Sequence, residues 1–126
     1  MLSKSKAHPT LPVTDIERAR KFYGETLELK LREELAPGHL LYDAGEGTFL
    51  IVYERPTPTK ADSTAASFIV ADVEATVKGL KDRGVVFEEY NFPGLQTVNS
   101  IATMGNVKGA WFKDPDDNIL AISEVA

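Results

Sequence analysis

An internal repeat divides this sequence into two similar halves. A shift of 57 positions places Val13, Asp15, Ile16, Glu17 and Lys21 on Val70, Asp72, Val73, Glu74 and Lys78. A shift of 70 positions places Tyr42, Leu50, Val52 and Glu54 on Phe112, Leu120, Ile122 and Glu124. Self-similarity at a fixed shift is the sequence signature of a repeated structural unit, so it predicts two copies of one strand–helix–hairpin unit.

Each copy begins with a strand that leads into a helix. In the first copy the strand covers residues 7–13, and Thr14 with Glu17 has the spacing of a capping box. The helix that follows has an apolar stripe made of Ile16, Ala19, Phe22, Tyr23 and Leu27. In the second copy the strand covers residues 67–70, Asp72 is the predicted N-cap, and Gly84 ends the helix.

The remainder of each copy consists of strands and turns. Extended segments are predicted at residues 30–34 and 85–90, and hairpins at 42–54 and 112–124, because apolar strands flank turn-forming residues there. The stretch 91–109 shows little periodicity and is predicted to be a long loop over one mouth of the sheet. The predicted fold class is α+β, with two βαβββ repeats, residues 6–55 and 64–126, joined by a linker at 56–63 in one domain, 1–126.

Composition restricts the classes of partner. The net charge is −5, Lys and Arg are scattered, and cysteine is absent. Nucleic acid and anionic membranes are therefore poor partners, and disulfides and cysteine zinc sites are excluded. No apolar run approaches the roughly 18 residues of a membrane span, so we expect a cytoplasmic protein.

Three motifs resemble the vicinal oxygen chelate superfamily, which includes glyoxalases, bleomycin resistance proteins and dioxygenases. They are His8-Pro-Thr-Leu-Pro-Val-Thr-Asp15, Arg18-Ala-Arg-Lys-Phe-Tyr23 with Leu27, and Trp111-Phe-Lys-Asp-Pro-Asp-Asp-Asn118-Ile-Leu. The resemblance implies curved mixed sheets around a cleft, usually within a homodimer. In metal-dependent members, four strands each supply one ligand to a divalent ion.

The resemblance assigns four positions to those ligands. His8 occupies the first, whereas the others hold Ile51, Ala65 or Ala66, and Ala121. Three of the four side chains have no lone pair for a metal, and a catalytic ion needs about three protein ligands, so no metal and no cofactor is predicted. A relocated divalent-metal site using His39, Tyr53 or Glu54 is the alternative.

Strand alternation predicts which side chains line the cleft. The candidate ligand-binding residues are His8, Thr10, Phe49, Ile51, Tyr53, Phe68, Trp111 and Ala121. His8 is a weak candidate for acid–base catalysis, or a strand histidine without a function. Trp111 stacks on a ligand or belongs to the core. Tyr42 is a further phenolic donor, and residues 114–118 form a turn rather than a calcium loop, which would need a glycine and a terminal glutamate.

These features favour metal-free binding of a small hydrophobic or aromatic molecule in the cleft, with resistance or sequestration as one use. The alternative is a divalent-metal-dependent lyase, isomerase or dioxygenase of the glyoxalase kind. A structural or regulatory role through a dimer surface is a third hypothesis. Whether the protein is an enzyme is left open by the sequence.

Overall fold

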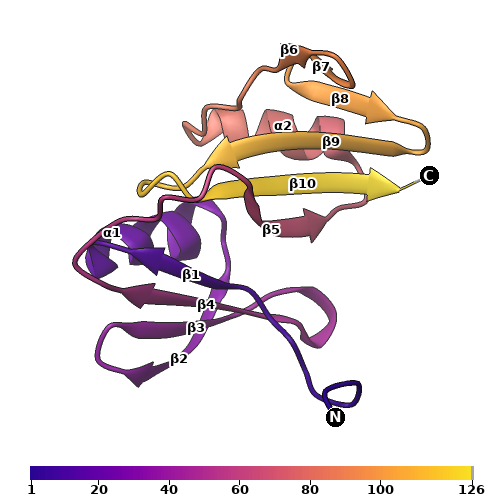
Figure 1. Ribbon diagram of the computed structural model, residues 1–126. Helices are drawn as coiled ribbons and strands as arrows, with labels where there is room; N and C mark the ends of the chain where they lie inside the picture. The colour runs from indigo at the N-terminus through magenta and orange to yellow at the C-terminus, as the bar shows by residue number, and fades with distance from the viewer. Residues whose placement is uncertain (126) are drawn as a thin grey trace. The chain divides into compact units, whose positions relative to one another are not determined.

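The computed structural model describes residues 1–125, in two compact units (Figure 1). Unit 1 contains Met1–Thr59, and unit 2 begins at Lys60. The boundary falls inside the predicted linker, residues 56–63. No helix among the described residues has the length and apolar character needed to cross a lipid bilayer.

Unit 1 has the predicted βαβββ order. Its elements are β1 (Thr10–Val13), α1 (Ile16–Arg20) continued by a π-helical segment (Lys21–Thr26), β2 (Lys30–Ala36), β3 (His39–Asp43) and β4 (Phe49–Glu54). The sheet order is β1-β4-β3-β2, with β1 parallel to β4 and the other pairs antiparallel. The first hairpin prediction is therefore confirmed by the β3–β4 pair.

The core of unit 1 lies on one face of this sheet. Leu11 and Val13 of β1 and Leu50 and Val52 of β4 are all at most 2% exposed, as alternation predicts. Ala19 and Tyr23 of the helical stripe are buried with them. Tyr42 belongs to this core too: its ring centroid lies 6.1 Å from that of Tyr23, and burial raises its pKa.

The first helix begins one residue later than the capping box predicts. Asp15 is the N-cap, and its carboxylate accepts hydrogen bonds from the backbone N–H groups of Glu17 and Arg18. Thr14 instead accepts a hydrogen bond from the Arg18 guanidinium. Both residue types are good N-caps, and the extended backbone at Asp15 decides between them.

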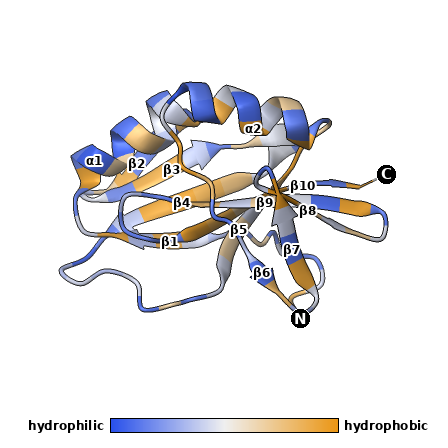
Figure 2. Ribbon diagram, turned by 90° about the horizontal axis from the view of Figure 1, so that it is seen from above, coloured by the Kyte–Doolittle hydropathy of each residue, from blue (hydrophilic) through white to orange (hydrophobic). Residues whose placement is uncertain are grey.

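Unit 2 contains a longer sheet. Its elements are β5 (Thr64–Ile69), α2 (Val73–Asp82), β6 (Asn91–Phe92), β7 (Leu95–Val98), β8 (Ile101–Met104), β9 (Val107–Lys113) and β10 (Ile119–Val125). The order is β5-β10-β9-β8-β7-β6, and the β9–β10 pair confirms the second predicted hairpin. Asp72 caps α2, and Gly84, at φ +90°, ends it as predicted. In Figure 2 both helices carry hydrophilic and hydrophobic stretches, as amphipathic helices do.

Two predictions about strands and loops in unit 2 are wrong. Residues 85–90 do not form a strand, and only an isolated bridge joins Phe87 to Phe112. The stretch 91–109 is not a loop, because it contains β6, β7, β8 and the start of β9. The β7–β8 turn uses Asn99 and Ser100 at φ 52° and 75°, so it lacks the glycine that marks most tight hairpins.

In both units a glutamate of the last strand accepts a hydrogen bond from the first residue of the helix. The Glu54 carboxylate accepts a hydrogen bond from the Ile16 backbone N–H at 2.8 Å, and Glu124 does the same for Val73 at 2.8 Å. These are equivalent positions of the repeat. A carboxylate at a helix N-terminus satisfies an unpaired donor and offsets the helix dipole, so each glutamate ties its last strand to its helix.

Replacing either glutamate with glutamine should destabilise the protein. We expect Glu124→Gln to lower the free energy of unfolding by about 1 kcal/mol, because the charge at the helix start is lost. Glu54→Gln should have a similar or smaller effect, since its hydrogen bond is more exposed. Urea denaturation measures both, with the exposed Glu33→Gln as control; an unchanged midpoint in both variants would contradict this role.

Candidate functional site

The face of the unit 1 sheet opposite to its buried core carries four of the eight predicted cleft residues. Register pairs Thr10 with Ile51, Leu41 with Ile51, and Asp43 with Phe49. Directly paired residues point to the same side of a sheet, opposite to the buried Leu50 and Val52. We call this surface the open face of unit 1; it consists of Thr10, Pro12, His39, Leu41, Asp43, Phe49, Ile51 and Tyr53.

Phe49 lies at the centre of a cationic cluster on this face. The Arg32 guanidinium carbon is 4.8 Å from the ring centroid and Lys6 Nζ is 5.8 Å away. The His8 ring approaches Phe49 edge-on at 6.1 Å. Arg32 is fixed by a 2.9 Å ion pair from its Nε to Asp43. Cations over an aromatic ring are attracted by its quadrupole, so this end of the face combines a flat apolar surface with positive charge.

His8 does not lie in a strand, contrary to prediction. β1 begins at Thr10, and the last contact before it is the hydrogen bond from the Ile51 N–H to the Pro9 carbonyl at 3.0 Å. The first predicted strand therefore starts three residues too early. His8 is exposed and reaches the open face by its contact with Phe49.

The other end of the open face holds a stacked pair. The rings of His39 and Tyr53 are 6.0 Å apart and inclined by 21°. His39 Nδ1 lies 3.2 Å from the Pro37 carbonyl oxygen, which can only accept, so Nδ1 is the donor in this contact. The stack presents a second aromatic surface with polar atoms at its edges.

The side chains do not fit the divalent-ion site that the resemblance implies. Ile51 points to the open face without a donor atom, Ala65 or Ala66 stands in β5, and Ala121 is 7% exposed in β10. The relocated site is also incomplete, because Glu54 binds the Ile16 N–H while His39 and Tyr53 stack together. Within residues 1–125, no three His, Asp or Glu side chains gather in a metal-binding group.

Trp111 lies on the face of the unit 2 sheet that it shares with Ala121. Register pairs these two residues, and the Trp111 ring meets Tyr90 edge-on at 5.5 Å. The ring centroid of Tyr90 also lies 5.8 Å from that of Phe92. Burial raises the pKa of the Tyr90 hydroxyl. The Trp111 ring also lies over Gly109, where an added Cβ would be 3.4 Å from the indole, an ordinary van der Waals contact. Trp111 is half-buried in this aromatic cluster.

Phe68 lies on the opposite face of its sheet from the cleft face that was predicted for it. Phe68 pairs with Ile122, whereas Ala121 pairs with Ser67. Phe68 therefore shares the face of the buried Leu120 and Ile122, and Ser67 takes the side of Trp111 and Ala121. A register shift between β10 and β5 at Ile119 and Leu120 produces this change, and short strands give no signal for it.

Sequence reasoning missed Arg32 and Lys6 on the open face. β2 has irregular register on both sides of Glu33, so simple alternation cannot assign the face of Arg32. Lys6 lies before the first strand, where no periodicity applies. The stack of His39 on Tyr53 follows from the hairpin register: four residues from the Asp43–Phe49 pair along each strand, the same register pairs His39 with Tyr53.

Comparison with known proteins agrees with the fold. A glyoxalase family protein from Bacillus anthracis superposes with a TM-score of 0.77 at 16% identity, covering 98% of this chain and 96% of that one. A glyoxalase/dioxygenase from Nostoc punctiforme superposes with a TM-score of 0.72 at 18% identity, covering 99% of this chain and 94% of that one. The antibiotic-binding protein TnmS3 from a Streptomyces species gives 0.70 at 25% identity and full coverage of both chains.

The family model of the Glyoxalase/Bleomycin resistance protein/Dioxygenase superfamily matches residues 6–122. This match includes both repeats and all three motifs that carry the resemblance. The sequence model and the solved structures therefore agree over nearly the whole chain, and the chain belongs to the Glyoxalase/Bleomycin resistance protein/Dioxygenase superfamily.

Proposed function

We propose that this protein binds a small hydrophobic or aromatic molecule without a metal, and that the open face of unit 1 supplies part of the binding surface. The observation that carries the proposal is the replacement of metal donors by apolar and aromatic side chains. Ile51 stands at a ligand position and is flanked on its strand by Phe49 and Tyr53. Partly exposed aromatic rings with a few fixed polar groups are typical of organic ligand sites.

The relatives support binding rather than one fixed chemistry. TnmS3 is described as an antibiotic-binding protein and is 25% identical to this chain over its full length. Other members with the same fold are described as glyoxalases and dioxygenases. Since one fold supports several activities, the side chains of the site have to decide, and here they favour an organic ligand over a bound ion.

We also propose that the protein forms a homodimer. β5 is an edge strand of the unit 2 sheet, and its Ile69 is 80% exposed. Edge strands with exposed apolar side chains tend to pair with another chain. Light scattering coupled to gel filtration should give twice the mass of 13.8 kDa, and a monomer at micromolar concentration would contradict this assembly.

The proposal is tested by titrating the purified protein with a panel of aromatic antibiotics and metabolites in a calorimeter. We expect at least one compound to bind, and Phe49→Ala to weaken it about tenfold because the ring surface is lost. Val86→Ala, a change at an 80% exposed apolar residue in unit 2, is the control and should leave affinity unchanged. Absence of binding across the panel, or equal loss in both variants, would contradict the proposal.

A further inference from the structure

Two cations meet at the Phe49 ring on the open face of unit 1, and one carboxylate pairs with them. The Arg32 guanidinium carbon is 4.8 Å from the ring centroid, and Lys6 Nζ is 5.8 Å away. Within residues 1–125 the Arg32 guanidinium donates a single hydrogen bond, from Nε to Asp43 at 2.9 Å. The terminal nitrogens carry the other N–H donors of the guanidinium. Because the Arg32 side chain is 52% exposed, a ligand can reach them.

The other carboxylates near this end of the face do not neutralise the cations. Lys6 contacts the aromatic ring and has no ion pair in the part of the chain that the structure describes. Glu33 of β2 and Glu46 of the turn between β3 and β4 form no ion pair with Lys6 or Arg32 within residues 1–125. One positive charge is therefore left beyond the ion pair with Asp43. This excess suits a ligand with a single negative charge, since a second would be repelled by the Asp43 carboxylate.

An apolar strip leads away from the cations along β4. Ile51 follows Phe49 on the same face and is paired with Leu41, and Tyr53 comes next, stacked on His39. With a rise of roughly 3.3 Å per residue, the strip from Phe49 to Tyr53 is about 13 Å long. Its length and flat rings suit a small planar molecule that lies along the strand.

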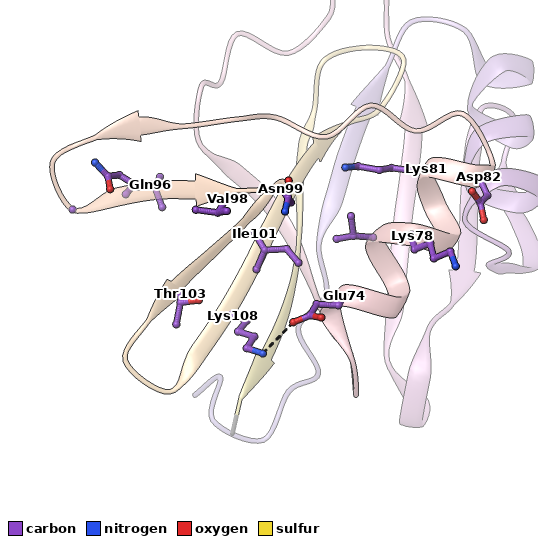
Figure 3. Close-up of a pocket in the computed structure, with 13 residues that line it drawn as sticks. Glu74, Lys78, Lys81, Asp82, Gln96, Val98, Asn99, Ile101, Thr103 and Lys108 are labelled. Carbon is purple, nitrogen blue, oxygen red and sulfur yellow. Dashed lines mark hydrogen bonds and ion pairs between the residues drawn. The ribbon is translucent and has the colours of Figure 1, made fainter.

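The groove beside α2 in unit 2 does not offer this combination (Figure 3). Its Lys108 is paired with Glu74 at 3.4 Å, and its Lys81 interacts electrostatically with the Glu89 carboxylate. The polar Gln96 lies among its apolar lining residues. The open face of unit 1, by contrast, places an excess positive charge at the end of an apolar strip.

We propose that the open face of unit 1 selects organic monoanions, in which a carboxylate is attached to an aromatic or hydrophobic body. Arg32 and Lys6 bind the carboxylate, and the body lies over Ile51 toward Tyr53. The planar guanidinium matches the geometry of a carboxylate, and Lys6 adds a compact charge beside it. This inference rests on the proposed function and names the class of ligand for the same site.

Cinnamate, an aromatic monoanion, and cinnamamide, a neutral molecule of the same shape, are the probes. Each is titrated into isotopically labelled full-length protein while backbone amide shifts are recorded by NMR. We expect both to shift residues 49, 51 and 53, and cinnamate to bind about tenfold more tightly, because only cinnamate makes charge-assisted hydrogen bonds.

Arg32→Gln should weaken cinnamate about tenfold and leave cinnamamide unchanged, so that the preference for the anion disappears. Arg32→Lys should restore part of it, since the charge returns without the planar group. Lys6→Gln, which leaves the Arg32–Asp43 pair intact, should weaken cinnamate about threefold. Lys21→Gln is the matched control, because it removes the same charge from the helical segment on the core face of the sheet and should leave both affinities unchanged.

The outcomes separate this inference from the proposed function. Equal affinity for the two probes, or equal loss of cinnamate binding in the Arg32→Gln and Lys21→Gln variants, would overturn selection by charge while binding of aromatic molecules at the open face stands. The absence of shifts on the open face with either probe would also overturn the inference. If the aromatic panel is inactive as well, the proposed function fails with it.

Discussion

Asp114→Asn is expected to lower the free energy of unfolding by about 2 to 3 kcal/mol. Asp114 is 3% exposed at the turn between β9 and β10. Its carboxylate accepts hydrogen bonds from the N–H groups of Asp116 and Asn118 at 2.9 and 2.8 Å, and from the Asn118 side-chain amide at 2.8 Å. In the asparagine side chain of this variant one carboxylate oxygen becomes an NH₂ group, which cannot accept. At least one of the buried N–H donors of Asp116 and Asn118 then loses its acceptor.

Asp117→Asn is the matched control in the same turn. Asp117 is exposed and has φ 67°, a conformation that asparagine tolerates well. Urea denaturation of the two variants should show a large shift for Asp114 and almost none for Asp117. Equal effects would mean that the turn depends on net charge and not on the hydrogen bonds of Asp114. Turn formation accounts for this acidic segment, as the sequence predicts.

Glu89→Gln should cost about 1 to 2 kcal/mol of stability at neutral pH. Ser100 is 1% exposed and donates both its N–H and its hydroxyl to Glu89. A neutral amide accepts these bonds more weakly and offers one oxygen instead of two. Glu89 itself is exposed, which limits the loss.

The effect of Glu89 depends on pH. Hydrogen bonds from Thr97 and then Ser100 hold the pKa of the Glu89 carboxyl below its usual range in the folded protein. A lowered pKa means that Glu89 stabilises the fold above its unfolded-state pKa of about 4.3, and that this stabilisation is lost as pH falls through the folded pKa. The difference between the protein and Glu89→Gln should therefore shrink from pH 7 toward about pH 3.

Glu88→Gln serves as the control for this pair of measurements. Glu88 forms an exposed 3.3 Å ion pair with Lys113, and such pairs contribute less than about 1 kcal/mol. The role of the Glu89 carboxylate would be contradicted if Glu89→Gln lowered the free energy of unfolding no more than Glu88→Gln. A loss of the same size at pH 7 and at acid pH would contradict it too.

The repeat explains why much of the fold could be predicted from the sequence. Alternation in β1 and β4 separates Leu11 and Val52, which are buried, from Thr10 and Ile51 on the open face. These strands pair in regular register, so a period of two is sufficient. The helix stop at Gly84 was also predictable, because a glycine at positive φ is the usual helix terminator.

The errors arise where local signals compete or where register changes. Thr14 and Asp15 are adjacent and both suit an N-cap, so sequence alone could not choose between them. The shift at Ile119 and Leu120 reverses the face of Phe68. Ser100 adopts positive φ because Glu89, eleven residues earlier, holds it, and no window of a few residues contains that contact.

The candidate site was predicted less completely than the fold. Alternation places Phe49, Ile51 and Tyr53 on one face of β4, as the structure has them, whereas the position of Arg32 depends on register irregularities in β2 that the sequence did not indicate. The chain retains the frame of its superfamily with other side chains at the expected metal positions. Its ligand chemistry is accordingly expected to differ from that of metal-dependent members.

One measurement tests the central claim most directly: calorimetric titration of the best compound from the aromatic panel into protein before and after exhaustive treatment with a chelator. We predict equal affinity in both titrations, and no change when divalent nickel, zinc, manganese or iron is added back. Binding that disappears with the chelator and returns with one equivalent of a divalent ion would contradict the account.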